Sequence, residues 1–209
     1  MAKVTKTLDP KTIEFIAAQP MFFVGTACDG PGGHVNISPK GMRGTLHVAN
    51  ERTIAYLDYV GSGAETVAHL RQNGRIVLMF CAFEGAPRTV RVHGTGAAIA
   101  ASTPAFASWL DRFPDASHDG VRAVVLVTVA RVSQSCGTGV PLMRYVGERE
   151  IIPRWAHNLG SQRLAAYRDR WNRTSIDGLP SFDETFVLSD PASPSRPEPP
   201  RRARSKRAD

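Results

Sequence analysis

The chain is poor in cysteine and lacks long apolar runs. Its 209 residues include three cysteines, Cys28, Cys81 and Cys136, and no CxxC pair. An odd number of widely separated cysteines argues against a disulfide framework and against a zinc site. The longest apolar runs, at 76–81 and 121–130, fall well short of the roughly 20 residues that a membrane-spanning helix needs. The N-terminal residues are polar, so we expect a cytoplasmic protein without a signal peptide.

Several motifs of nucleotide and metal chemistry are also absent from the sequence. It has no GxxxxGK[ST] phosphate loop and no HExxH metal motif. The GxG segments at 94–96 and 137–139 do not open a βαβ unit with a downstream acidic residue, so a Rossmann dinucleotide site is not supported. The six histidines are spread singly along the chain. The sequence therefore identifies no metal ligands and no catalytic acid or base.

The net charge of +7 is concentrated at one end of the chain. Residues 191–209 contain six basic and two acidic residues, five of the fifteen prolines and no large apolar residue, and the remaining 190 residues carry only +3. A segment of this composition cannot bury a core. We therefore expect a single folded domain over 1–185 and a disordered Pro/Arg-rich tail over 186–209. Nucleic-acid binding through that tail is the least favoured function.

Alternating apolar residues and turn residues predict a mainly β protein of the α+β class. Helical patterns interrupt the strands without alternating regularly with them, which favours an antiparallel β-barrel with peripheral helices over a doubly wound parallel sheet. Strand patterns occur at 21–27, 34–40, 52–59, 75–83, 87–99 and 121–132. Helical patterns occur at 9–19, 62–73, 103–113 and 162–171.

A candidate anion-binding site lies where the strand at 52–59 leads into a helix. Gly61, Ser62 and Gly63 form the connecting turn, and Ser62 and Glu65 have the spacing of a capping box. The first backbone N–H groups of a helix are unpaired and attract anions, and glycines let a phosphate approach closely. The alternative is that Ser62 only caps its own helix and the glycines only turn the chain.

Cations elsewhere in the chain could complete such a site. Lys40 is the only lysine between residues 12 and 205, and it follows Ser38 at the end of a predicted strand. Together with Ser62 these residues offer hydroxyl and ammonium donors to one phosphate. Arg88 and Arg91 lie on the strand at 87–99, where the alternation of side chains places them on opposite faces. Either arginine could instead be a paired surface charge.

The order and spacing of these segments resemble the pyridoxamine 5'-phosphate oxidase-related FMN-binding proteins. The resemblance covers about residues 10–182. It rests on FFVGTA at 22–27, VNISPKG at 35–41, YLDY at 56–59, GSGAET at 61–66, NGR at 73–75 and RTVRVHG at 88–94. The later SCG at 135–137 and SIDGLP at 175–180 resemble one bacterial branch of the same family.

The resemblance implies a split β-barrel that forms a homodimer, with two FMN molecules in clefts between the subunits. It implies that β-strand residues and the glycine turn contact the flavin phosphate or ribityl chain, and that an arginine stands on the flanking strand. The candidate cofactor-binding residues on this basis are Asn36, Ser38, Lys40, Asp58, Tyr59, Gly61, Ser62, Gly63, Arg88 and Arg91.

The resemblance further implies an FMN-dependent oxidoreductase acting on a small molecule. The true oxidases have a Ser-Arg-Lys run at the phosphate turn, where this chain has Ser62, Gly63 and Ala64. Their C-terminal arginine and histidine segment for pyridoxal phosphate has no clear counterpart, so we do not expect oxidation of vitamin B6. The alternatives are a reductase of the same fold that uses deazaflavin F420, and a non-catalytic flavin- or haem-handling module.

Overall fold

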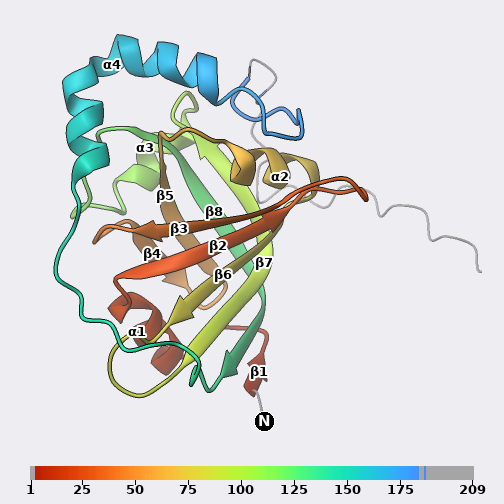
Figure 1. The fold of residues 1–209 in the computed structure, drawn as a ribbon, viewed down its shortest axis with the longest axis vertical. Helices are drawn as coiled ribbons and strands as arrows, with labels where there is room; N and C mark the ends of the chain where they lie inside the picture. The colour runs from red at the N-terminus through yellow and green to blue at the C-terminus, as the bar shows by residue number, and fades with distance from the viewer. Residues whose placement is uncertain (1–2, 184–185, 187–209) are drawn as a thin grey trace, which may run out of the picture.

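One eight-stranded antiparallel sheet dominates the computed structural model, which describes residues 3–183 and 186 (Figure 1). Seven strands form a continuous path in the order β3-β2-β6-β7-β8-β5-β4, and β1 pairs with β8. The strands are β1 (Lys3–Thr5), β2 (Met21–Ala27), β3 (Val35–Gly41), β4 (Leu46–Asn50), β5 (Thr53–Tyr59), β6 (Arg75–Cys81), β7 (Thr89–Ala100) and β8 (Val121–Ser135). The predicted antiparallel split barrel is confirmed, with β3 and β4 at the two ends of the path.

The four helices lie around the edges of the sheet, as Figure 1 shows. They are α1 (Pro10–Ala18), α2 (Glu65–Asn73), α3 (Ala105–Leu110) and α4 (Ile151–Trp171). The start of α1 is as predicted: the side chain of Asp9 accepts a hydrogen bond from the Thr12 backbone N–H, and Pro10 opens the first turn. The peripheral helices of the sequence prediction are therefore present.

Two local predictions are wrong. The first turn of α2 has Ala64 at the N-cap and no side-chain cap, so Ser62 and Glu65 do not form a capping box. Ser62 instead stays exposed in the turn that precedes the helix. The helix predicted at 162–171 is only the second half of α4, whose first half is joined to it across a kink at Gly160. The glycine there has a φ of 76°, which breaks the helical pattern read from the sequence.

The core fills the inside of the curved sheet. Fully buried apolar side chains from β2, β5, β6, β7 and β8 meet there, among them Val24, Tyr56, Phe80, Val92 and Val125. A second cluster lies on the other side of β5 and β8, where Leu57 and Phe113 pack with residues of α3. Alternate residues of β5 and β8 therefore face apolar surroundings on both sides, which explains why the β8 sequence is almost continuously apolar.

After β8 the chain leaves the sheet and follows the outside of the molecule. Residues 136–150 contain neither helix nor strand, and they run from one end of the barrel to the other before α4 begins (Figure 1). This course brings the residues around Tyr145 and Ile152 to the mouth of the cleft described below. Among the described residues no helix is both long and apolar enough to cross a membrane. Of the predicted tail at 186–209, all but Phe186 falls outside the described residues.

Gly94 marks a close contact between β7 and β8. The pairing of the two strands shifts register between His93 and Gly94, and a Cβ at Gly94 would clash with the carbonyl oxygen of Thr128. We expect Gly94→Ala to lower the free energy of unfolding by about 1 to 3 kcal/mol, the usual effect of overpacking. Gly139→Ala is the matched control, because a Cβ there meets no described atom within 4 Å. Chemical denaturation of both variants checks this, and equal stabilities would contradict it.

Candidate cofactor cleft

A cleft of about 870 Å³ opens at the split in the barrel. Its walls are the inward face of β3, the turn after β5, the start of α2 and the segment that leads into α4. Small-molecule and cofactor sites in proteins usually measure about 300 to 1,000 Å³. The cleft is therefore large enough for a ligand of mononucleotide size.

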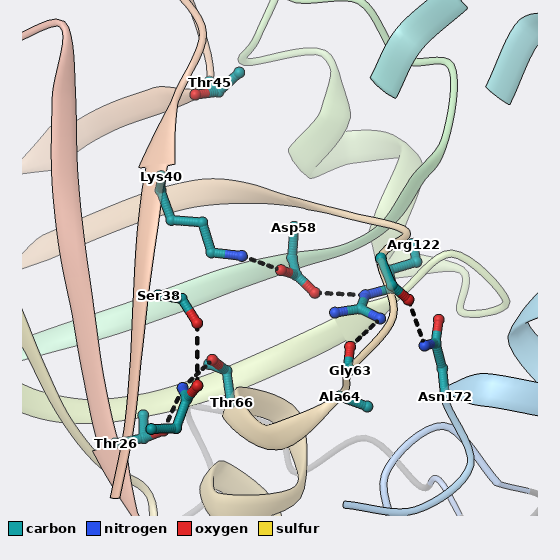
Figure 2. Close-up of polar contacts among 12 residues, drawn as sticks. Thr26, Ser38, Lys40, Thr45, Asp58, Gly63, Ala64, Thr66, Arg122 and Asn172 are labelled. Atoms are coloured by element: carbon teal, nitrogen blue, oxygen red, sulfur yellow. Dashed lines mark hydrogen bonds and ion pairs between the residues drawn. The ribbon is translucent and has the colours of Figure 1, made fainter. Parts of the chain in front are cut away.

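Strand β3 carries its polar side chains inward. Asn36, Ser38 and Lys40 alternate along one face of the strand and line the cleft. The Ser38 hydroxyl donates to Asn36 Oδ1 at 3.1 Å, and Asn36 Nδ2 donates to the hydroxyls of Thr26 and Thr66, each at 3.1 Å (Figure 2). The amide of Asn36 is thus occupied by protein partners, and its role is to hold β2, β3 and α2 together beside the cleft.

A buried carboxylate lies beneath this wall. Asp58 on β5 is fully buried, and its two oxygens accept from Lys40 Nζ and Arg122 Nε, each at 2.7 Å (Figure 2). Burial alone would raise the pKa of Asp58, but the positive charges of Arg122 and Lys40 outweigh it and lower that pKa to about 2. Asp58 is therefore ionised at neutral pH and joins β3 to β5 and β8 across the split.

The turn between β5 and α2 is held from behind by three side chains. Arg122 Nη1 donates to the carbonyl oxygen of Gly63 at 2.8 Å, and Asn172 Nδ2 donates to that of Gly61 at 2.9 Å. The Ser181 hydroxyl donates to the carbonyl oxygen of Ala64 at 3.2 Å. With its carbonyl groups bonded in this way, the turn is fixed in place before any ligand binds.

Gly61 and Gly63 leave space in the cleft. A Cβ added at either position would meet no atom of the described residues within 4 Å, and neither glycine has a positive φ. The backbone conformation therefore does not require glycine. Because both residues line the cleft, their missing side chains keep room for a ligand close to the backbone.

The charges around the cleft nearly cancel. Lys40 and Arg122 share Asp58, and Glu65 adds a second carboxylate in the first turn of α2. Glu65 Oε1 accepts from the Ile176 backbone N–H, and within the described residues Oε2 is buried without a hydrogen-bond partner. Arg149 also lines the cleft, beside the carboxylates of Glu148 and Glu150. A phosphate dianion in this cleft would therefore depend on hydroxyl and backbone N–H donors, on Arg149, or on cations from outside the subunit.

Tyr59 lines the same cleft but is not a candidate acid or base. Its hydroxyl donates to the carbonyl oxygen of Ser117. Burial, and then the nearby Asp119, raise the pKa of Tyr59 to about 12. The phenol therefore stays protonated at neutral pH.

Most of the candidate residues named from the sequence are brought together here. Seven of them line the cleft and Asp58 lies directly beneath it, whereas Arg88 and Arg91 lie outside it. Arg88 donates to Thr12 Oγ1 and Gln134 Oε1 and covers the Phe15 ring, so it connects α1 to the sheet. Arg91 donates to the hydroxyl of Ser135. The seven lining residues are Asn36, Ser38, Lys40, Tyr59, Gly61, Ser62 and Gly63.

Sequence reasoning missed Arg122, which holds both Asp58 and the turn. The available signal was its position, because Arg122 is the only charged residue in the apolar run 121–130. A charge in a buried strand needs a buried partner, and Asp58 is the matching acid on the neighbouring strand. Thr66 and the residues around Tyr145 were also missed, because only the folded chain brings them to the cleft.

Comparison with known proteins identifies the family. The family model for pyridoxamine 5'-phosphate oxidase matches residues 8–136. The pyridoxamine 5'-phosphate oxidase family protein ustO of Aspergillus flavus is 35% identical over 191 residues, which cover 85% of this chain and 76% of that protein. The chain therefore belongs to the pyridoxamine 5'-phosphate oxidase family, as the order of its sequence segments predicted.

Solved structures with a similar fold are more distant. HupZ of Group A Streptococcus is 20% identical, with a TM-score of 0.45 over 60% of this chain and 91% of that one. An FMN-binding protein from Syntrophomonas wolfei is 15% identical, with a TM-score of 0.43 over 62% of this chain and 82% of that one. Likenesses at this level carry no conclusion about the ligand or activity of this chain.

We expect Asp58→Asn to lower the free energy of unfolding by about 3 to 5 kcal/mol at pH 7, because it leaves the buried Arg122 without its counter-charge. The pKa of Asp58 lies below its ordinary value of 3.8. Its stabilisation is therefore complete above about pH 4 and is lost as the pH falls toward 2. Denaturant titrations across this range should show a weaker acid dependence in the variant than in the wild type. Asp111→Asn, at an exposed carboxylate, is the control; an unchanged profile for Asp58→Asn would contradict the assignment.

Proposed function

We propose that the protein is a flavoprotein that binds FMN in the cleft and acts as an FMN-dependent oxidoreductase on a small-molecule substrate. The observation that carries this proposal is the meeting of Lys40 and Ser38 on β3 with the fixed turn and the start of α2, in a chain of the pyridoxamine 5'-phosphate oxidase family. When bound, the flavin would supply the hydride or electron transfer, and the protein its binding and orientation.

The residues present suit a phosphorylated ligand. The Lys40 side chain is partly exposed and lines the cleft, and Ser38 and Ser62 line the same cleft. The first N–H groups of α2 add donors and the positive end of a helix. The space left by Gly61 and Gly63 allows the phosphate to approach these donors. These groups would hold the phosphate end and leave the wider part of the cleft to the ring system.

A homodimer is part of the proposal, and the support comes from the outer face of β3. Val35 and Ile37 point away from the barrel and are 72% and 69% exposed, although their strand carries polar residues inward. An edge strand with an apolar outer face favours pairing or packing with another chain. A second copy of the same chain would cover both the strand edge and its apolar face.

The pairing of the strands shows that this outer face continues from β3 across β2 and β6 to β7. Pro39 is opposite Phe23, Phe23 is opposite Met79, and Met79 is opposite Arg91. Arg91 thus stands on the same outer face as the apolar residues of β3. In a two-fold dimer this arginine could reach the partner's cleft and add positive charge to a site whose own acidic and basic residues offset one another.

The first experiment is an absorption spectrum of the purified full-length protein, with mass identification of what it releases on denaturation. We expect flavin absorption and the mass of FMN. Titration of the apoprotein with FMN, FAD and a deazaflavin then gives the preference. Preference for the deazaflavin would favour the reductase alternative. Flavin binding without reduction by NAD(P)H or reoxidation would favour the non-catalytic module, and a protein that takes up no flavin would overturn the proposal.

We expect Lys40→Ala to weaken FMN binding by about 10- to 100-fold, because a charge-assisted hydrogen bond contributes about 1.5 to 3 kcal/mol. The fold should persist, since Asp58 keeps its bond to Arg122. Ser62→Ala should weaken binding less, because it removes a neutral donor. Fluorescence titration measures both affinities. Lys11→Ala, on the exposed face of α1, is the control, and equal affinities in Lys40→Ala and Lys11→Ala would show that the phosphate lies elsewhere.

We expect Ile37→Glu to raise the dimer dissociation constant by about 30-fold or more, because it places a charge in an apolar interface. Sedimentation velocity over a range of concentrations measures this directly. Trp171→Glu is the control, since Trp171 is an exposed apolar residue at the end of α4 and belongs to no strand of the sheet. Flavin affinity should fall together with dimer formation. A wild-type chain that is monomeric at all concentrations would contradict this part of the proposal.

A further inference from the structure

A second polar cluster lies outside the cleft, at the other end of the β2–β3 hairpin. It joins three segments: Cys28 directly follows β2, His69 lies on α2, and Asp177 lies in the turn after α4. One ligand atom from each of these residues lies within 4.8 Å of the other two. Cys28 and His69 are buried, and the Asp177 side chain is only 14% exposed.

His69 has an unused nitrogen in this cluster. Its ring is fully buried, with Nδ1 lying 3.0 Å from the hydroxyl oxygen of Thr26. Nε2 is also buried and has no hydrogen-bond partner within the described residues. A buried polar nitrogen without a partner is unfavourable, because it has lost its hydrogen bonds to water. Because Nδ1 is already occupied, Nε2 is the nitrogen that a ligand would engage.

Asp177 is oriented by its neighbours. His34 places Nδ1 at 2.6 Å from Asp177 Oδ1, and its backbone N–H donates to Oδ2 at 3.1 Å. The Cys28 thiol donates to the same Oδ2 at 3.3 Å. The backbone N–H groups of Asp177 and Leu179 both donate to the hydroxyl of Ser175, which fixes the turn. The carboxylate is thus held against the thiol rather than left free in solvent.

We propose that Cys28, His69 and Asp177 form a binding site for a divalent transition metal ion, with Zn²⁺ as the best fit. Thiolate, imidazole and carboxylate are all ligands of zinc, and three protein ligands with an open fourth position are typical of its reactive sites. A pocket of about 280 Å³ borders Cys28 and Asp177, so a water molecule can complete the coordination.

Metal binding would change where two protons are held, the thiol proton of Cys28 and the ring proton of His69. The metal replaces the thiol proton of Cys28, which is released to solvent. Coordination by Nε2 of His69 requires its proton to be on Nδ1, which then donates to Thr26 Oγ1. That oxygen already accepts from Asn36 Nδ2 and has a second lone pair available. Thr26 thus orients the histidine ligand from behind, as hydrogen-bonded partners of metal ligands commonly do.

The same surroundings do not suit a nucleophilic cysteine. The Cys28 thiol is buried and donates to the Asp177 carboxylate, whose negative charge disfavours a thiolate. Reactive cysteines instead lie near positive charge, which stabilises the thiolate. A metal ion supplies that positive charge, and it satisfies Nε2 of His69 at the same time.

The site departs from the expectation that the sequence sets. The absence of a CxxC pair argues against zinc, but here a single cysteine is joined by two ligands that are 41 and 149 residues away in sequence.

A chain of hydrogen bonds also connects the proposed metal site to the cofactor cleft. Hydrogen bonds run from His69 through Thr26 to Asn36, and Asn36 accepts from Ser38 in the cleft wall.

The test uses full-length protein, freed of any affinity tag and expressed with added Zn²⁺. After dialysis, elemental analysis should find about one zinc ion per chain, the stoichiometry of a mononuclear site. Cys28→Ala should retain close to none. Cys81→Ala is the matched control, because Cys81 is equally buried but lies on β6, and it should retain zinc like the wild type. A wild-type chain without zinc, or equal zinc in both variants, would overturn the proposal.

Cobalt provides a readout of the ligands themselves. Co²⁺ added to the metal-free protein should produce a thiolate-to-cobalt charge-transfer band in the difference spectrum, together with the intense visible bands of a four-coordinate ion. The charge-transfer band should disappear in Cys28→Ala. Asp177→Asn keeps the shape of the side chain and lies on a surface turn, so it tests the site even if Cys28→Ala does not fold. We expect it to weaken Co²⁺ binding at least about 10-fold. Binding as tight as wild type would contradict the role of Asp177.

Discussion

The structure depends on one buried carboxylate. Asp58 has no contact with solvent, and its charge is stabilised by Arg122 and Lys40, which approach its two oxygens from different strands. β3 and β5 lie near opposite ends of the sheet path, and among the described strands no backbone hydrogen bonds join them directly. The interaction between Lys40 and Asp58 therefore connects the two sides of the split in the barrel. Arg122 also bonds the carbonyl oxygen of Gly63, and the same charges therefore set the position of the turn at the mouth of the cleft. The geometry of the candidate site follows from the need to neutralise Asp58.

This arrangement has an electrostatic consequence. A lysine that already neutralises a carboxylate brings less net positive charge to a ligand than a free lysine does. Glu65 lowers the net positive charge of the cleft further. The proposed FMN site would therefore use hydroxyl groups, backbone N–H groups and the α2 terminus for much of its binding. The outer face of β3 makes the proposed homodimer relevant here, because Arg91 stands on the same face as the exposed apolar residues. The proposed association, which would cover an apolar edge strand, would thus also bring more positive charge to the cleft.

The proposed metal site and the cleft share a framework. Thr26 and Asn36 are opposite each other on β2 and β3, and they connect His69 on one side with Ser38 on the other. Buried polar groups in such a chain depend on one another, because each hydroxyl or amide has a limited number of donors and acceptors. A change in the tautomer of His69 would therefore change the hydrogen bonds of Thr26 and Asn36, which hold β3 in place.

Local patterns in the sequence determined several secondary-structure elements of this protein and its family. The buried-strand pattern at 21–27 and the alternation along 34–40 predicted the first hairpin, Asp9 and Pro10 predicted the start of α1, and the order of the segments identified the family. These features depend on neighbouring residues, so they are visible without the fold. Only the tertiary structure decided that Arg122 pairs with Asp58, that Arg88 bonds a residue of α1 instead of lining the cleft, and that Cys28, His69 and Asp177 meet. Such contacts join residues that are tens of residues apart, and the partner of a buried charge is selected by the packing of the whole sheet, which no local spacing specifies.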